Sequence, residues 1–261
     1  MNRAPTPGDP VHDPMDEFTL LCERCGYVLE GLDESTRCPE CARPITESLP
    51  QIARTGSPWQ RQRSTGPGSR RMWAGIWPTI VAMYTRPGPT LSQLRIEAGP
   101  CRMMGTMLSL IASTVLVAPL AGLLAWGLGA PFALRTEDLI GAIVVLLGLL
   151  MGWGCVLVVL VFLTFIEEAG ILVFGRVHKR RITPAVAETV CAHACIGWIT
   201  AAVLFWVAAA AAMLIGDPGL GVALLLGALF LGLLHFEVLV WMGVRRCRYA
   251  NRSRSGGTLP H

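Results

Sequence analysis

Four cysteines near the N-terminus have the spacing of a metal-binding site. Cys22 and Cys25 form one CxxC pair, and a 12-residue loop separates it from a second pair, Cys38 and Cys41. Two such pairs place four thiolates around one ion, with metal–sulfur distances of about 2.3 Å. We expect one zinc ion here; iron in a rubredoxin-like site and a pair of disulfides are the alternatives. Four protein ligands leave no open position for a substrate, so the ion should be structural.

The segment around these cysteines, residues 19–48, contains few residues that could form a core. The apolar candidates are Tyr27, Leu29, Leu32 and Ile45, too few for a domain of about 30 residues without a crosslink. Metal binding is therefore expected to supply most of the folding free energy. The segment carries six carboxylates against three arginines. This charge disfavours nucleic acid as a partner and favours a protein.

A second group of chemically capable residues lies within or beside long apolar segments. Glu237 interrupts an otherwise uncharged segment, and a carboxylate at membrane depth is a candidate functional group. Four further side chains should lie near the same side of the membrane: Glu167, Glu168, His193 and His235. Together they could carry protons or a cation, as in a small transporter or membrane enzyme. The structural alternative is favoured, because His235 and Glu237 are two residues apart and point to different helix faces.

No catalytic residue is assigned. The sequence contains no HExxH, GxSxG, Walker or dinucleotide-binding motif. An enzyme therefore has no identified nucleophile or open metal site, and a protein without catalysis is the favoured interpretation.

The elements that must position these groups are helices in a membrane. Of 261 residues, 52% are hydrophobic and 15% charged, whereas about a quarter of a soluble domain is charged. Four apolar segments exceed the roughly 20 residues needed to cross a bilayer: 103–128, 139–166, 190–215 and 219–244. The predicted fold is an α-helical membrane protein with four transmembrane helices and a small N-terminal zinc ribbon. A Gly216–Gly219 turn predicts a tight hairpin between the last two spans.

The remaining segments are expected to be polar or interfacial. Residues 1–18 are rich in Pro and Asp, which predicts a disordered leader without a secretory signal. Residues 49–71 form a basic flexible linker, 72–102 form interfacial or amphipathic helices, and 245–261 form a basic tail. Trp73 and Trp77 share a helix face suited to headgroup depth. The alternative is that this short helix packs against the other helices.

Positive charge predicts the orientation of the chain. Arginines gather before the first span, between the second and third, and after the fourth, whereas the first loop has Arg135 alone and the third loop has none. By the positive-inside rule both termini, and hence the ribbon, are cytoplasmic. The basic linker and tail should then contact anionic lipid headgroups.

Two family resemblances follow from these motifs. The stretch CERCGYVLEGLDESTRCPECARPI resembles the short zinc ribbons with CxxCGY and CPxCG knuckles at the N-termini of many bacterial multi-span membrane proteins. Ala42 stands where the second knuckle usually has glycine, which implies strain in that turn. The following chain, with TRPGPTLSQL leading into the helices, is similar to the Yip family of membrane-trafficking domains, which usually have five spans. The resemblances imply a bacterial inner-membrane protein whose ribbon binds another protein.

Overall fold

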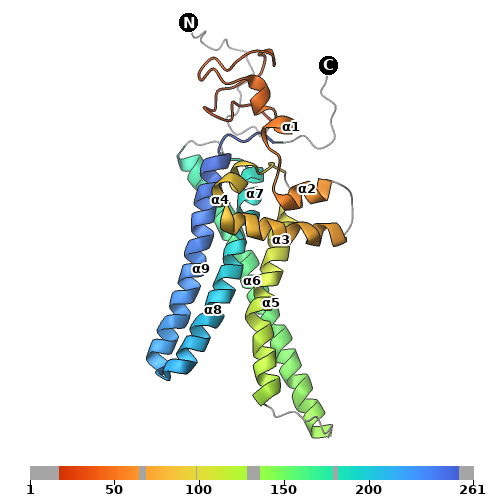
Figure 1. Ribbon diagram of the computed structural model, residues 1–261, viewed down its shortest axis with the longest axis vertical. Coiled ribbons are helices and arrows are strands. Elements are labelled where there is room, and N and C mark those ends of the chain that lie inside the picture. The colour runs from red at the N-terminus through yellow and green to blue at the C-terminus, as the bar shows by residue number, and fades with distance from the viewer. Residues whose placement is uncertain (1–17, 65–68, 98, 128–135, 179–181, 253–261) are drawn as a thin grey trace.

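The computed structural model describes residues 18–64, 69–97, 99–127, 136–178 and 182–252. The expected leader lies outside the described residues except for Phe18, and so does the expected tail beyond Arg252. Figure 1 shows a small ribbon unit at one end of the molecule and long helices that run away from it.

Four helical segments are long and apolar enough to cross a membrane, as predicted. In Figure 1 they form two antiparallel hairpins, α5 with α6 and α8 with α9, which diverge with distance from the ribbon. Helix α6 continues 11 residues beyond the predicted end at Ile166, because an apolar stretch follows Glu168 and extends the helix. The four segments are α5 (Pro100–Gly127), α6 (Thr136–Val177), α7 with α8 (Pro184–Ala194 and Ile196–Ile215), and α9 (Pro218–Cys247).

The third predicted span, residues 190–215, needs a correction at its start. Its first residues belong to α7, which ends at Ala194, and α8 starts at Ile196 after a break at Cys195. Residues 185–194 of α7 are all buried. Since α5, α6 and α9 surround this helix, it is enclosed by protein and only α8 has the exposed apolar surface of a span.

The turn between α8 and α9 forms as expected. Gly216 has φ 72°, in the left-handed region that glycine adopts without strain. The Asp217 carboxylate then accepts a hydrogen bond from Leu220 N at 2.9 Å and caps α9. The two helices pack closely beyond this turn, and a Cβ on Gly197 would lie 2.6 Å from Phe236 Cα.

Residues 50–64 differ from the flexible linker predicted for 49–71. They contain two short helices, and Trp59 and Arg54 are fully or almost fully buried. Trp59 belongs to the main hydrophobic core and Arg54 donates to Arg246 O at the end of α9, and these contacts order the segment. The short elements before the first span are η1 (Ile45–Ser48), α1 (Pro50–Ala53), α2 (Pro58–Ser64), α3 (Ser69–Thr85) and α4 (Pro87–Ser92).

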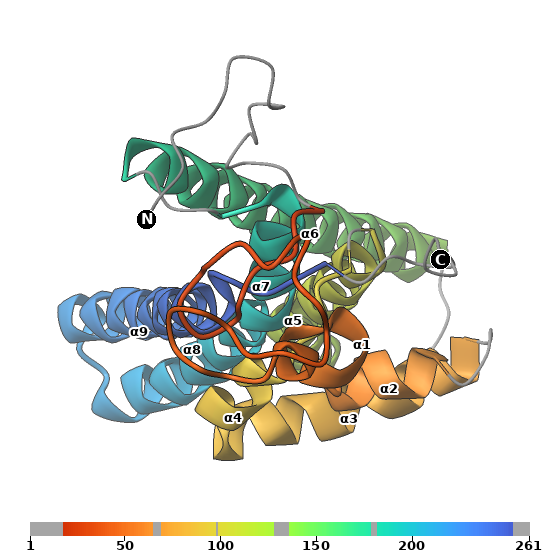
Figure 2. The same ribbon diagram turned by 90° about the horizontal axis from the view of Figure 1, so that it is seen from above.

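The main hydrophobic core lies at the ribbon end of the helices. It joins residues of α2, α3 and α4 to most of α7 and to the nearby ends of α5, α8 and α9. Viewed from above, α7 lies near the centre of this assembly, with α6 on one side and α3 on the other (Figure 2). The membrane-spanning parts of α6 are largely exposed in contrast, as helices facing lipid should be. The molecule is therefore packed most tightly just below the ribbon.

Candidate metal centre

The four predicted cysteines come together in one cluster. All four sulfur atoms lie within 4.8 Å of one another. Cys22 Sγ is 3.4 Å from Cys41 Sγ, and Cys25 Sγ is 3.6 Å from Cys38 Sγ. A tetrahedron with metal–sulfur distances of about 2.3 Å has edges of about 3.8 Å. The arrangement therefore fits one tetrahedral ion, and these contacts are longer than the roughly 2.05 Å of a disulfide bond.

Two knuckles of nearly identical geometry build this cluster. Cys22 N donates to Tyr27 O at 2.8 Å, and Cys38 N donates to Arg43 O at 2.8 Å. The donor and the acceptor of the second hydrogen bond each lie sixteen residues after those of the first. The same offset relates the turns at Gly26 and Ala42, which have φ 81° and 57°. Ala42 is the non-glycine residue with positive φ in the described chain, so the turn strain implied by the missing glycine is present.

The surroundings of the sulfur atoms favour a bound cation. Burial acts to raise the pKa of Cys22, but N–H groups of Cys25 and Arg24 outweigh it and lower this pKa to about 6. Burial raises the pKa of Cys25 to about 12, with the neighbouring thiols acting in the same direction. Ionisation of Cys22 and Cys25 together is therefore favoured by a positive ion between them. A divalent metal supplies that charge when bound.

The core of the ribbon is smaller than the sequence indicates. Leu29 and Ile45 are almost fully buried and pack with the cysteines, at equivalent positions sixteen residues apart. Tyr27 and Leu32, also predicted to be core residues, are 38% and 37% exposed. Only one apolar side chain after each knuckle points inward. A core of this size is expected to need a crosslink such as a bound metal ion to hold the fold.

A buried ion pair fastens the ribbon to the rest of the protein. Arg54 Nε lies 3.0 Å from the Glu23 carboxylate, and both side chains are less than 10% exposed. The same guanidinium donates to Arg246 O at 3.1 Å and to Leu94 O at 3.4 Å. Burial acts to lower the pKa of Arg54, but attraction to Cys247 and Glu23 outweighs it and raises this pKa. One cation thus joins the first knuckle to the end of α9.

The segment after α9 covers the first knuckle. Tyr249 packs so closely on Gly26 that a Cβ there would lie 2.6 Å from its ring. Asn251 is buried and donates to the carbonyl oxygens of Leu21 at 2.7 Å and Ser48 at 2.8 Å. The last membrane helix therefore continues directly into the ribbon interface.

The structure distributes the five candidate intramembrane residues over separate environments. His193 is fully buried, and its ring nitrogens lie 2.8 Å from Thr189 O and 3.0 Å from Ser57 Oγ. His235 Nδ1 instead lies 2.8 Å from Thr200 Oγ1. Glu167 and Glu237 lie close enough to each other to interact electrostatically. These contacts place His235 and Glu237 on different helix faces, as expected.

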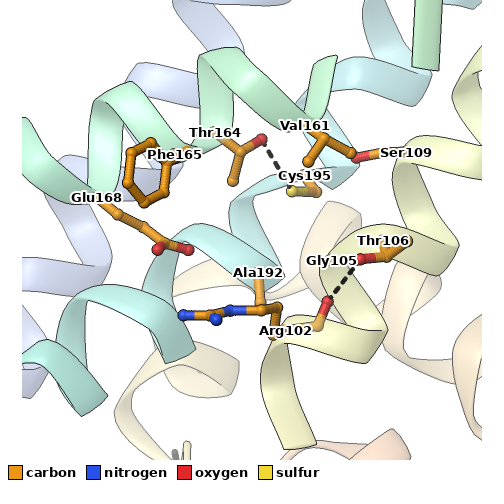
Figure 3. Close-up of a pocket in the computed structure, with 10 residues that line it drawn as sticks. All are labelled: Arg102, Gly105, Thr106, Ser109, Val161, Thr164, Phe165, Glu168, Ala192 and Cys195. Carbon is orange, nitrogen blue, oxygen red and sulfur yellow. Dashed lines mark hydrogen bonds between the residues drawn. The ribbon is translucent and has the colours of Figure 1, made fainter. Parts of the chain in front are cut away.

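Glu168, the remaining candidate, lines a cavity of about 160 Å³ between α5, α6 and the junction of α7 and α8. Figure 3 shows its carboxylate on the same side of the cavity as the Arg102 guanidinium, with Cys195 and Ser109 farther away. Cys195 contacts Thr164 across 3.6 Å. Among the described residues, only the four ribbon cysteines form a group of three or more metal-binding side chains. The cavity therefore has no donor set for a metal.

Comparison with known proteins gives no family for this chain: no family model, curated protein or solved structure matches it. The similarity to the Yip family stays a prediction from the sequence.

The sequence did not reveal Arg54 and Asn251 as functional positions. Arg54 is one of many arginines in a segment that reads as a linker, and Asn251 lies in a polar stretch after the last span. The sequence offered only a weak signal for Arg54: Glu23 is an acidic residue inside the first CxxC pair, but Glu40 lies inside the second pair in the same way.

Proposed function

We propose that this chain is a multi-span protein of the bacterial cytoplasmic membrane that presents a structural zinc ribbon to a protein partner in the cytoplasm. The observation that carries the proposal is the way the ribbon is mounted. Its first knuckle is held by Arg54 and Asn251, while residues 27–42 project away from the helices with mostly exposed side chains. A rigid mount and an exposed outer surface are what a docking module needs.

The chemistry of the outer surface indicates the class of partner. Residues 27–42 carry four exposed carboxylates and one arginine, next to the partly exposed apolar side chains of Tyr27, Val28 and Leu32. Acidic groups beside apolar ones complement a protein surface that is basic at its rim and apolar at its centre. The acidic charge repels nucleic acid.

Zinc is the proposed ion because four thiolates and a closed tetrahedral arrangement are typical of structural zinc sites. The cytoplasmic orientation is supported by positive charge on the ribbon side of the spans, including Arg176 at the end of α6 and Arg245 and Arg246 at the end of α9. The transporter or enzyme alternative is not favoured, because the two histidines have different hydrogen-bond partners and Glu168 lines a cavity that neither histidine lines.

The test is site-specific photo-crosslinking in membranes. A photoreactive residue at Leu32 should give one defined adduct with a protein partner, and the adduct should need Cys38. The double variant Asp33→Asn/Glu34→Gln removes two charges. Ser35 N donates a hydrogen bond to Asp33 Oδ1 at 2.8 Å, and the side-chain oxygen of the introduced asparagine can still accept it. We expect this variant to weaken the adduct at least fivefold.

The matched control is Asp217→Asn, which removes one carboxylate charge at the opposite end of the molecule and keeps the cap on α9. It should leave the adduct unchanged. The absence of an adduct at Leu32 would contradict the proposal. So would an adduct whose yield is unchanged in the Asp33→Asn/Glu34→Gln variant.

A further inference from the structure

One face of α3 is apolar and uncovered. Trp73, Trp77, Val81 and Tyr84 follow one another at helical spacing, and each is at least 41% exposed. At about 100° per residue, these four positions fall within roughly 80° of the helix circumference. Large apolar side chains gathered on one face of a surface helix mark an interaction surface.

The opposite face of α3 packs on α2. Trp59 N donates to Thr79 Oγ1 at 2.9 Å, and a Cβ on Gly75 would lie 2.8 Å from Trp59 Cα. Figure 1 shows α2 on the ribbon side of α3, and α3 lying across the long helices near their ribbon ends. The aromatic face of α3 therefore points away from the ribbon, toward the membrane-spanning parts of the helices.

Tyr84 supports the same direction through a separate contact. Its hydroxyl lies 2.6 Å from Thr200 Oγ1, in the second turn of α8, and this threonine hydroxyl also contacts His235 Nδ1 at 2.8 Å. Because α8 and α9 are candidate spans, Tyr84 marks the level at which they enter the bilayer. Trp and Tyr are enriched at that level because one end of each ring system is apolar and the other polar.

A groove of about 730 Å³ connects this aromatic face to a cationic end. Trp77 and Val81 line the apolar end, and Arg86 and Gln93 line the end nearer the ribbon. Arg86 is the one cation among the described residues that line the groove, because Arg246 contacts α4 at Gly88, which is not part of the lining. None of the described residues that line the groove is acidic.

We propose that this groove binds one anionic glycerophospholipid from the leaflet beside the ribbon. The phosphate would lie at Arg86, and the upper acyl chains would cover Trp77 and Val81. An amphiphile matches both ends of the groove at the depth where headgroups lie. A soluble anion would use only Arg86, and a second copy of the chain paired through the same groove would bring its own Arg86 against this one. Each arginine near an anionic surface contributes about 1 kcal/mol, which is roughly fivefold in affinity.

The test is native mass spectrometry of the full-length protein in detergent, titrated with either phosphatidylglycerol or phosphatidylcholine of identical chains. We expect one phosphatidylglycerol per chain, bound several-fold more tightly than phosphatidylcholine. Arg86→Gln should weaken it about fivefold, and Trp77→Ala should weaken both lipids.

Arg176→Gln is the matched control, because Arg176 lies in the last turn of α6 on the same side of the membrane but outside the groove. It should leave the stoichiometric lipid in place. Equal loss with both arginine variants would mean diffuse charge attraction and overturn the site. Displacement of the lipid by millimolar inorganic phosphate, or a dimer mass in place of the lipid adduct, would overturn it in favour of a free anion or a second copy.

Discussion

The side-chain amide of Asn251 pairs with the backbone of Leu21 as a neighbouring β-strand would. Leu21 N donates to Asn251 Oδ1 at 2.9 Å, and Asn251 Nδ2 donates back to Leu21 O at 2.7 Å. Asparagine suits this role because its amide offers a donor and an acceptor in one plane. Since Asn251 lies four residues beyond the end of α9 at Cys247, it couples the last membrane helix to the metal-binding knuckle.

Replacement of Asn251 should loosen the ribbon. In Asn251→Asp the acceptor oxygen remains, but both donors to Leu21 O and Ser48 O are lost and a negative charge faces those carbonyl oxygens. Buried polar groups left without partners cost about 1–3 kcal/mol each. We expect exchange of the Leu21 amide to accelerate roughly 30-fold, measured by hydrogen–deuterium exchange of residues 19–30 in detergent. Unchanged exchange would mean that the ribbon is held elsewhere.

Loss of the buried Arg54–Glu23 pair should destabilise the ribbon far more than loss of the exposed Arg43–Glu47 pair. Arg54→Met leaves the Glu23 carboxylate buried without its partner, which costs about 3–5 kcal/mol for pairs of this kind. Hydrogen exchange should therefore increase strongly both in the first knuckle and around Arg246, whose carbonyl Arg54 also binds.

Two controls separate the charge from the shape of Arg54. The double variant Arg54→Met/Glu23→Leu removes the unpaired charge and should recover a large part of the protection. Arg43→Met breaks an exposed pair with Glu47 within the same ribbon, which should cost less than about 1 kcal/mol. Similar effects of Arg43→Met and Arg54→Met would contradict the role assigned to Arg54.

Ala42→Gly should stabilise the second knuckle. Ala42 has φ 57°, a conformation that costs an alanine about 1 kcal/mol and a glycine little. Zinc should therefore bind more tightly, by up to about fivefold in a chelator competition. Gly26→Ala is the converse change. It should weaken both zinc binding and the packing of the ribbon on the segment after α9, because its Cβ would collide with the Tyr249 ring.

The positions that local rules determine were predictable from the sequence. The metal cluster follows from the Cys22–Cys25 and Cys38–Cys41 spacings, and the spans follow from runs of apolar residues, because both patterns act within a short stretch of chain. The strained turn at Ala42 was visible for the same reason. The Gly216 and Asp217 turn likewise uses residues whose conformational preference is local.

Contacts between distant segments were not predictable in this way. The burial of α7 depends on three surrounding helices, and hydropathy alone does not distinguish a helix in protein from a helix in lipid. Arg54 looks like a linker arginine until Glu23, Leu94 and Arg246 meet around it. Tyr27 and Leu32 were assigned to the core because they are apolar, and their exposure follows from the repeated geometry of the knuckles.

Glu237→Gln distinguishes a structural carboxyl group from an ion-conducting site. Glutamine keeps the shape of glutamate and removes only its ability to ionise, since an amide replaces the carboxyl group. We expect normal expression, an unchanged melting temperature and an unchanged Leu32 crosslink. Loss of the crosslink in a well-folded Glu237→Gln protein would move the functional site from the ribbon into the membrane.

Removal of the metal should unfold the ribbon and spare the helices. The ribbon core of Cys22, Leu29, Cys38 and Ile45 is a cluster separate from the main core, whose buried residues begin at Trp59. A zinc chelator should therefore abolish exchange protection in residues 19–48 while the helical circular dichroism stays within about a tenth of its starting value, and added zinc should restore the protection.

Cys38→Ser should reproduce the chelated state, whereas Cys155→Ser, on an exposed face of α6, should retain one zinc per chain. Loss of helix together with loss of metal would show that the membrane helices depend on the ribbon through the contacts of Arg54 and Asn251. The ribbon and the helices would then stabilise each other.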